Sequence, residues 1–209
     1  MMKSLLNVFF LYLSIGLRRA LKVILRILIL PFWKIDEILP RSGVIIDLGC
    51  GEGGLANYLA FRSQDRKILG IDLTRERIQL AKKTVMEGSR VKFIRGDALK
   101  VSLQSADCYL LVDVLHHIIF SKQEGLLKEL SQKMDKNSLL VIKEVDDSKF
   151  LQFWFGHIIE KILYQKEVIS TRSTKEWLKL FNLLGLSCRI GSGNLLFPDS
   201  TILFVCKKK

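Results

Sequence analysis

The sequence predicts an α/β fold, a three-layer sandwich in which a seven-stranded, mostly parallel sheet lies between layers of helices. Short apolar runs, typical of buried strands, alternate with longer helical patterns from Val44 onward. Strands that alternate with helices form right-handed crossovers, so they pair in parallel. The last two runs are joined by a short segment with Gly and Pro, which favours an antiparallel hairpin at one edge of the sheet.

The expected elements follow in chain order within one domain, residues 41–209. Short apolar runs predict strands at Val44–Leu48, Ile68–Asp72, Val91–Ile94, Cys108–Val112, Leu139–Val145, Leu186–Ile190 and Thr201–Cys206. Longer periodic patterns predict helices at 54–62, 75–87 and 121–134, and a capping box at 173–176 opens a helix that reaches Leu184.

Residues 1–40 form a separate apolar and basic helical segment ahead of this domain, which Pro31 divides from a short linking helix. Four cations interrupt the apolar run from Leu5 to Trp33, so no uncharged stretch reaches the ~18–20 residues of a spanning helix. These cations are Arg18, Arg19, Lys22 and Arg26. A narrow basic stripe on an apolar helix is typical of a helix in the headgroup region of an anionic membrane. The alternative is a helix packed on its own domain with its arginines in solvent.

The chain is basic, with 33 Lys and Arg against 21 Asp and Glu and a formal net charge of +12. Such an excess fits nucleic acid, an anionic membrane surface or a solubilising excess of lysine. The four cysteines include no CxxC pair and no nearby histidine at ligand spacing, so we expect no metal site. Three of the four lie in apolar, strand-like surroundings, which favours buried inert thiols and a reducing compartment.

A glycine-rich turn follows the first expected strand in the stretch IIDLGCGEGG. Glycines at 49, 51 and 53 can adopt positive φ and let the backbone approach a ligand at the start of the following helix. Asp72 ends the next strand, 21 residues after Gly51, where a carboxylate can accept hydrogen bonds from both ribose hydroxyls. The spacing departs from the G-x-G-x-x-G of dinucleotide sites, so the turn predicts a nucleoside site of another kind.

Four stretches in this order resemble the motifs of class I S-adenosylmethionine-dependent methyltransferases, over roughly residues 40–145. IIDLGCGEGG is similar to their first motif and GIDLT to their second. GDAL is similar to the third, and DCYLLVDVLHHI, residues 107–118, to the fourth as it stands in the small-molecule branch, which acts on quinones and lipids. The resemblance implies a Rossmann-like sheet and S-adenosyl-L-methionine as the cofactor.

The resemblance also implies which residues bind that cofactor. In the first motif Asp47 and the backbone of the turn would hold the methionine portion, and in the second Asp72 would take the ribose with Leu73 against the adenine. The third motif would bind the adenine, and the fourth would lie beside the methionine portion near the reactive methyl. The full set is Asp47, Gly49, Cys50, Gly51, Gly53, Asp72, Leu73, Asp97, Ala98, Asp113 and Val114.

Methyl transfer is an in-line displacement that needs a base only when the nucleophile must lose a proton. His116 and His117 follow the fourth strand, and an imidazole that titrates near neutral pH could deprotonate a hydroxyl. The alternative for each is that it packs or caps the following turn. Glu144 and Asp146, at the end of the fifth strand, are further candidates for the acid or base.

The insertion at 146–172 lies where this fold places a substrate cover, and its aromatic side chains predict an apolar pocket, although a plain amphipathic helix is an alternative. The candidate substrate residues are Phe150, Phe153, Trp154 and His157. We therefore expect a small lipophilic acceptor, such as a quinone precursor, a polyene or a lipid head group. The protein would be cytoplasmic and bound to the inner face of the cytoplasmic membrane through residues 5–33.

Two other functions stay open. Enzymes of the superfamily that methylate base amino groups resemble one another in an [N/D/S]-P-P-[Y/F/W] motif, where this chain reads Asp113-Val114-Leu115-His116. The Pro-Cys pair of enzymes that methylate carbon 5 of a base is also absent, which disfavours nucleic acid. An RNA or protein methyltransferase that binds its polymer through its basic ends is the first alternative. A non-catalytic, cofactor-binding assembly protein is the second.

Overall fold

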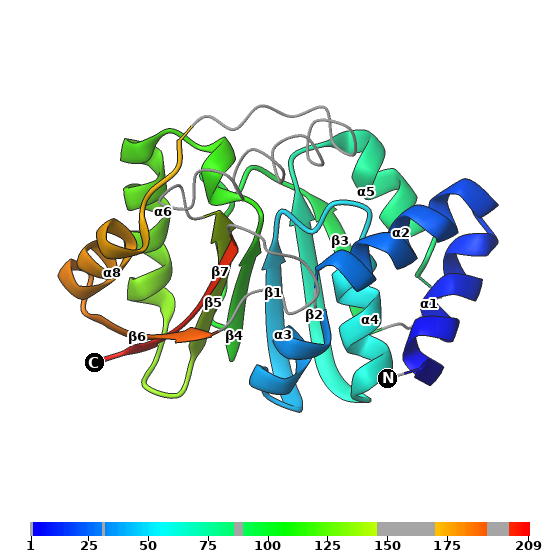
Figure 1. Ribbon diagram of the computed structural model, residues 1–209, viewed down its shortest axis with the longest axis horizontal. Helices are drawn as coiled ribbons and strands as arrows, with labels where there is room; N and C mark the ends of the chain where they lie inside the picture. The colour runs from blue at the N-terminus through cyan, green and yellow to red at the C-terminus, as the bar shows by residue number, and fades with distance from the viewer. Residues whose placement is uncertain (1, 31, 86–89, 146–169, 192–200) are drawn as a thin grey trace. The chain divides into compact units, whose positions relative to one another are not determined.

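The computed structural model describes residues 2–30, 32–85, 90–145, 170–191 and 201–209. Its strands form one mixed sheet in the order β3-β2-β1-β4-β5-β7-β6, which confirms the predicted Rossmann-like α/β fold (Figure 1). The strands are β1 (Ser42–Leu48), β2 (Asp65–Asp72), β3 (Val91–Arg95), β4 (Cys108–Val112), β5 (Leu139–Val145), β6 (Leu186–Gly191) and β7 (Thr201–Lys208). The helices are α1 (Met2–Leu13), α2 (Leu17–Ile29), α3 (Phe32–Ile38), α4 (Gly54–Arg62), α5 (Arg75–Lys82), α6 (Phe120–Lys133) and α8 (Thr174–Leu183), with a 3-10 turn η1 at Leu115–His117.

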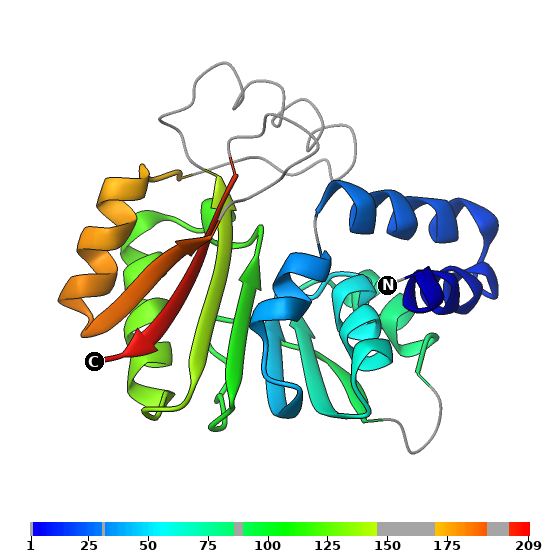
Figure 2. The ribbon, with the colours of Figure 1, turned by 60° about the horizontal axis from the view of Figure 1, so that its bottom comes forward.

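The first of two compact units comprises the chain up to Ser102 together with Ala106–Cys108. Within it β1 pairs in parallel with β2, and β2 with β3, so that Ile46 lies opposite Leu69 and Gly70 opposite Phe93. The N-terminal helices α1 and α2 form a hairpin that packs on α4 (Figures 1 and 2). The hairpin thus belongs to the same compact unit as the glycine turn.

The N-terminal segment is divided into two helices where the sequence analysis expected no break. Helix α1 ends at Leu13 and α2 begins at Leu17, and Gly16 between them has φ 144°, a conformation that favours glycine. Val8 and Tyr12 on α1 and Val23 and Ile27 on α2 are buried. In the part of the chain that the structure describes, no helix is both long and apolar enough to traverse a bilayer.

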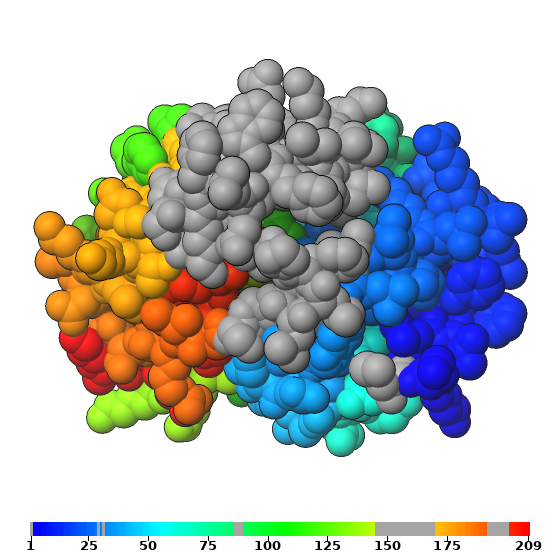
Figure 3. Space-filling view, viewed as in Figure 1, coloured from blue at the N-terminus to red at the C-terminus, as the bar shows by residue number. Residues whose placement is uncertain are grey.

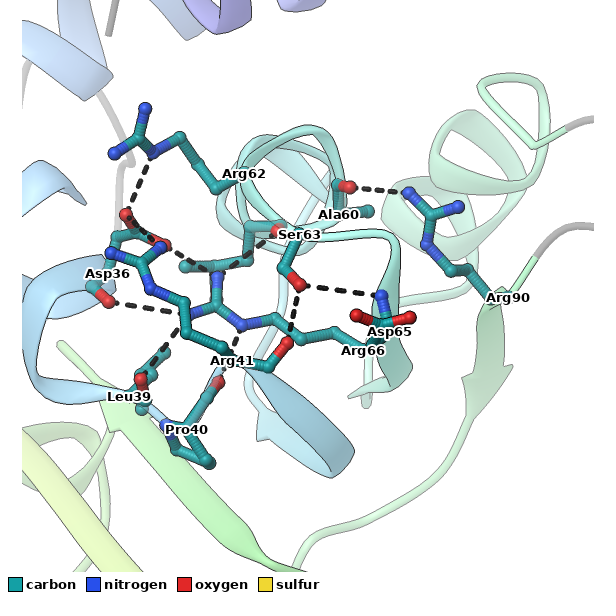
Figure 4. A network of polar contacts seen from close by, with 11 residues as sticks. Asp36, Leu39, Pro40, Arg41, Ala60, Arg62, Ser63, Asp65, Arg66 and Arg90 are labelled. Carbon is teal, nitrogen blue, oxygen red and sulfur yellow. Dashed lines mark hydrogen bonds and ion pairs between the residues drawn. The ribbon is translucent and has the colours of Figure 1, made fainter.

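A buried ion cluster joins α3 to α4 and β2 in the same unit (Figure 4). The carboxylate of Asp36 accepts hydrogen bonds from Arg66 at 2.5 Å and Arg62 at 2.8 Å, and Arg41 adds bonds at 3.1 and 3.2 Å. Arg66 also donates to the backbone carbonyls of Asp36, Leu39, Pro40 and Leu59. The guanidinium of Arg66 therefore satisfies carbonyls at the end of α3 that would otherwise be buried without a donor.

The second unit comprises Leu103–Ser105 and the chain from Tyr109 onward. In it β7 runs antiparallel to both β5 and β6, which confirms the predicted antiparallel edge pair. Helix α8 starts at the predicted capping box, because Ser173 accepts from the Glu176 backbone N–H while the Glu176 carboxylate accepts from the Ser173 backbone N–H. Trp177 stacks on Phe181, whose ring meets Phe204 of β7 edge-on, so α8 is fixed to the sheet by aromatic contacts.

The prediction for the cysteines is wrong at two positions. Cys188 and Cys206 are joined by a disulfide, because the register of β6 and β7 places them opposite each other with 3.9 Å between their Cα atoms. The argument for a reducing compartment therefore does not hold. Cys50 and Cys108 are buried thiols outside the disulfide, and burial raises the pKa of both.

Candidate functional site

The glycine turn joins β1 to α4 through three residues with left-handed backbone. Gly49, Gly51 and Gly53 have φ of 79°, 59° and 84°. The N–H groups of Gly49 and Cys50 both donate to the Ile71 carbonyl, at 2.7 and 3.0 Å. The turn is therefore held on β2 by its own amides, and glycine is required because an L side chain at these φ values is strained.

Gly53 serves packing as well as turn geometry. A Cβ at this position would lie 2.5 Å from the Phe93 ring, and one at Gly70 would lie at the same distance from that ring. Gly53 is also the N-cap of α4. The third glycine of the motif thus makes room for a core aromatic of β3.

Asp72, at the end of β2, braces the turn. One carboxylate oxygen accepts from the Gly51 N–H at 3.0 Å and the other from the Thr74 N–H at 2.8 Å, at the start of α5. The side chain is buried. The residue expected to bind the ribose hydroxyls is therefore fixed against the glycine turn by two hydrogen bonds to backbone N–H groups.

Asp47, near the end of β1, is a buried carboxylate with an unsatisfied oxygen. Its exposed fraction is 2%, and among the described residues its Oδ2 atom has no hydrogen-bond partner. Burial raises the pKa of Asp47 to about 7, an effect that Arg26 partly offsets and the nearby Asp72 charge adds to. A buried carboxyl with a free acceptor fits a polar or cationic ligand group.

The cationic side of α2 faces this turn. Arg19 and Lys22 pair with the Glu52 carboxylate at 3.3 and 3.6 Å, and the Tyr12 hydroxyl donates to the Glu52 carbonyl at 2.6 Å. A Cβ on Gly51 would lie 3.4 Å from the Nη1 atom of Arg26. Sequence reasoning missed these contacts, although the i, i+4 spacing of the cations indicates that they share a face.

The remaining predicted cofactor residues of the first unit are partly exposed. Asp97 is half-buried and accepts from the Leu99 N–H at 3.0 Å, so its carboxylate shapes the loop after β3. Ala98 is half-buried and Leu73 is exposed. An exposed leucine directly after Asp72 is available to pack on a ligand, as expected for an adenine contact.

In the second unit, the loop after β4 carries the fourth motif. Asp113 has φ 56°, the one non-glycine positive φ among the described residues. Its Oδ1 atom accepts from the buried Lys143 ammonium at 2.8 Å, and its N–H donates to the Lys143 carbonyl at 3.0 Å. Val114 next to it is half-buried. The strained backbone of Asp113 is therefore held by a neighbouring strand, as at many functional sites.

Glu144 organises the same loop. Its Oε1 atom accepts from the N–H groups of Val114 at 3.0 Å and Leu115 at 2.6 Å, and its Oε2 atom lies 2.6 Å from Nδ1 of His116. Both Glu144 and His116 are 1% exposed. This geometry is that of a positioning residue that fixes the imidazole and η1. His117 is half-buried, with its ring edge-on to His116 at a centroid distance of 4.1 Å.

The segment before α8 is anchored to this cluster. The Ser170 N–H donates to the His116 carbonyl at 3.1 Å, and Gln123 donates to the Ser170 carbonyl at 3.1 Å. Arg172 bonds Gln123 at 3.0 Å and Glu124 at 2.8 Å. The candidates Asp146, Phe150, Phe153, Trp154 and His157 lie outside the described residues. The end of the expected substrate cover therefore meets the backbone of one candidate base.

The turn, Asp72, Asp97 and the loop after β4 all lie within residues 45–137, which match the family described as "Methyltransferase domain". This segment, a little under half of the chain, is therefore similar to that family. The Rossmann-like fold of the chain is shared by several solved structures, some of them methyltransferases. Several of these proteins were solved in complex with S-adenosylmethionine or SAH.

Two solved structures illustrate the similarity of the fold. The pyocyanin biosynthetic protein PhzM superposes with a TM-score of 0.72 at 20% identity, covering 96% of this chain and 62% of that one. Magnesium protoporphyrin IX methyltransferase from Synechocystis PCC 6803, with bound SAH, gives a TM-score of 0.65 at 19% identity, covering 86% and 80%.

The curated relatives are similar in sequence to part of this chain. "Probable inactive O-methyltransferase 11" of Dictyostelium discoideum is 30% identical over 161 residues, 75% of this chain and 46% of that protein. Carboxy-S-adenosyl-L-methionine synthase of Wolinella succinogenes is 26% identical over 149 residues, 66% of this chain and 62% of that protein. The corresponding synthase of Campylobacter jejuni is 23% identical over 109 residues, 52% of this chain and 46% of that protein. The chain thus spans about half the length of most of these relatives.

Proposed function

We propose that the protein is an S-adenosylmethionine-dependent methyltransferase that acts on a small lipophilic acceptor at a membrane surface. The observation that carries the first part is the glycine turn braced by Asp72 beside the buried, unsatisfied Asp47, inside a methyltransferase domain. When bound, the cofactor supplies an electrophilic methyl group on a sulfonium. A carboxylate that is costly to bury alone is stabilised by a cationic ligand, and S-adenosylmethionine carries both an ammonium and a sulfonium.

The residues of the second unit would then serve the acceptor. An acceptor hydroxyl must lose its proton as the methyl arrives, and an imidazole is suited to take it near neutral pH. Glu144 fixes His116 in one orientation and, when ionised, holds a proton on its Nδ1 atom. His117, less buried, is the second candidate for the same role.

The membrane part of the proposal rests on apolar side chains that the N-terminal hairpin leaves in solvent. They recur at spacings of three and four residues, so each helix presents one apolar stripe away from its packed face. The stripe comprises Met2, Leu6, Phe10 and Leu13 on α1 and Leu17, Leu21, Leu25 and Leu28 on α2, with exposed fractions from 37% to 70%. Figure 3 shows the N-terminal helices at the molecular surface. Exposed apolar residues in such number mark an interaction surface.

Charge favours an anionic lipid surface as the occupant. Lys3 on α1 and Arg18 on α2 are exposed, and Arg18 adjoins the apolar stripe on the helix. An apolar face flanked by cations is the composition of helices that lie in the headgroup region. The hairpin supports both hypotheses of the sequence analysis, since one face packs on α4 while another is available to lipid.

A methyl-transfer assay tests the acceptor class. The protein would be incubated with S-adenosylmethionine labelled in its methyl group and, separately, with membrane lipid extract, total RNA and protein lysate. We expect label in the lipid extract. Label in RNA or protein would support a polymer methyltransferase instead. A change in the mass of the cofactor by one carboxylate would point to the reaction named for the carboxy-S-adenosyl-L-methionine synthases, and binding without turnover to a non-catalytic role.

Vesicle flotation tests the membrane surface. We expect the protein to float with vesicles that contain anionic phosphatidylglycerol and much less with neutral phosphatidylcholine. The double variant Leu21→Ser and Leu25→Ser should reduce flotation at least several-fold. Leu183→Ser is the matched control, because Leu183 is 73% exposed and belongs to α8 rather than to the N-terminal hairpin. Flotation unchanged by the double variant would contradict membrane attachment through α2.

A further inference from the structure

Helix α2 contributes its cations to the glycine turn. Two of them, Arg19 and Lys22, engage the carboxylate of Glu52, and Arg19 is 40% exposed in its side chain. Arg26 lies one turn further along the helix, half-buried, with its guanidinium against Gly51. An Arg side chain presents several N–H donors in a planar fork that matches a carboxylate.

The guanidinium of Arg26 lies against the turn at Gly51. Its Nη1 atom is 3.4 Å from the position that a Cβ on Gly51 would take, which is ordinary van der Waals contact. Arg26 also acts electrostatically on two residues next to the turn, since its charge lowers the pKa of Asp47 and of Cys50 against the larger effect of burial. The guanidinium thus lies close enough to the turn to share a small ligand with Asp47.

Asp47 supplies the complementary charge. Its Oδ2 atom is buried without a hydrogen-bond partner in the described chain, so it can accept from a ligand donor. The Arg26 guanidinium from α2 and the Asp47 carboxylate from β1 therefore present opposite charges beside the same glycine turn. This is the arrangement that complements an α-amino acid, which carries a carboxylate and an ammonium on one carbon.

We propose that Arg26 binds the α-carboxylate, and Asp47 the α-ammonium, of the methionine portion of the cofactor, so that α2 forms part of the cofactor site. The inference rests on the proposed function, because it assumes that the turn binds S-adenosylmethionine. It adds a specific cofactor contact to a helix whose apolar stripe faces solvent. The amino-acid portion then provides much of the discrimination between the cofactor and simple nucleosides.

Two ligands that differ only at the amino-acid end test the proposal. S-Adenosylhomocysteine carries the α-amino acid, whereas 5′-methylthioadenosine keeps the adenosine and the sulfur but lacks it. Calorimetry on the full chain would compare wild type with Arg26→Met, which keeps an unbranched apolar side chain but removes the guanidinium and its charge. We expect the affinity for S-adenosylhomocysteine to fall about 10- to 100-fold, the effect of losing charged hydrogen bonds. The affinity for 5′-methylthioadenosine should change less than about twofold, within ordinary scatter for a remote site.

The matched control is Arg18→Met, on the same helix but exposed to solvent, which should leave both affinities unchanged. Arg26→Lys should restore part of the lost affinity, because it returns the charge without the planar fork. If Arg26→Met lowers the affinity for both ligands equally, Arg26 only supports the fold of the turn. If it lowers neither affinity, Arg26 does not bind the ligand. Either result overturns the inference while leaving the cofactor site intact. Failure of wild type to bind either ligand would instead overturn the proposed function.

Discussion

Two buried aspartates of the first unit have opposite surroundings. Asp36 is 0% exposed, and three arginines bond its carboxylate, two of them at 2.5 and 2.8 Å (Figure 4). Asp47 is 2% exposed, and its Oδ2 atom has no partner among the described residues. Burial alone would raise the pKa of both, but hydrogen bonds from Arg62 and Arg66 reverse this for Asp36, whose pKa is lowered. For Asp47 the effect of burial is the larger one, and its pKa is raised.

The difference separates a carboxylate that stabilises the fold from one that is suited to a ligand. The cluster around Asp36 is fully paired, as buried charges in a stable core must be. Asp47 keeps a buried acceptor unsatisfied, which lowers the stability of the unliganded protein. Such a cost is common where a site is arranged for a ligand rather than for the fold. The predictions below test whether the two aspartates differ in this way.

The largest expected effect is the loss of stability caused by Arg66→Met. The substitution keeps most of the side-chain volume but removes the hydrogen bonds that Arg66 donates to four backbone carbonyls and to one oxygen of the Asp36 carboxylate. Breaking one partner of a buried pair costs about 3 to 5 kcal/mol. Urea unfolding should show this loss in the free energy of unfolding. A loss below about 1 kcal/mol would mean that the cluster does not stabilise the unit.

Asp47→Asn should raise the free energy of unfolding above neutral pH, whereas Arg66→Met should lower it. The native pKa of about 7 exceeds the value of about 3.9 for an unfolded aspartate, so between these values the native state binds more protons than the unfolded state. The free energy of unfolding of wild type therefore falls as the pH rises through this range. Asn is neutral and so avoids the cost of burying an ionised carboxylate. The variant should therefore be more stable than wild type by up to about 4 kcal/mol at pH 8, and the difference should decrease toward pH 4. Thermal unfolding across this range would measure it, and a variant less stable at pH 8 would contradict the assignment.

Cofactor affinity should rise with pH because an ammonium on the ligand favours ionised Asp47. With a pKa of about 7 the ionised fraction increases from roughly a tenth to nine tenths between pH 6 and pH 8. Calorimetry with S-adenosylhomocysteine should therefore show about a tenfold gain in affinity over this interval. The Asp47→Asn variant is the control and should show weak binding with a flat profile. An affinity of wild type that does not change with pH would show that Asp47 does not bind the ammonium of the ligand.

The smallest effect is expected at the rim of the paired cluster. Arg41 bonds Asp36 at 3.1 and 3.2 Å, but its side chain is 56% exposed, so water compensates for its loss. Arg41→Met should reduce the free energy of unfolding by less than about 1 kcal/mol, as for other exposed pairs. The same urea experiment that measures Arg66→Met would measure it. A loss of stability equal to that of Arg66→Met would mean that the exposure of an arginine does not determine how much it contributes to the stability of the cluster.

Local sequence patterns predicted the fold well. Apolar runs placed all seven strands within three residues of their observed ends, and the capping box at Ser173 placed the start of α8. The alternation of strands and helices predicted a mostly parallel sheet, and the short link between the last two strands predicted the antiparallel pair at its edge. Helix α5 was extended too far, and the break at Gly16 was not expected, because one glycine within an apolar helical pattern does not by itself predict a turn.

Contacts between distant residues were not predictable in the same way. The pairing of Arg66 with Asp36, the disulfide between Cys188 and Cys206 and the approach of Arg26 to Gly51 join residues 18 to 30 positions apart, and periodicity does not encode such pairs. The motif order correctly placed the glycine turn and Asp72 together. The cations of α2 were assigned to lipid headgroups in the sequence analysis, whereas Arg19 and Lys22 pair with the turn.

The central claim is that the glycine turn of the first unit binds S-adenosylmethionine. Calorimetric titration of the chain with S-adenosylmethionine, beside the Asp72→Ala variant, tests it most directly, because Asp72 braces Gly51 and is the residue that we expect to bind the ribose. The account predicts one binding site per chain in wild type and at least a tenfold weaker site in the variant, provided that both unfold cooperatively. A wild-type protein that is folded and binds no S-adenosylmethionine would contradict it.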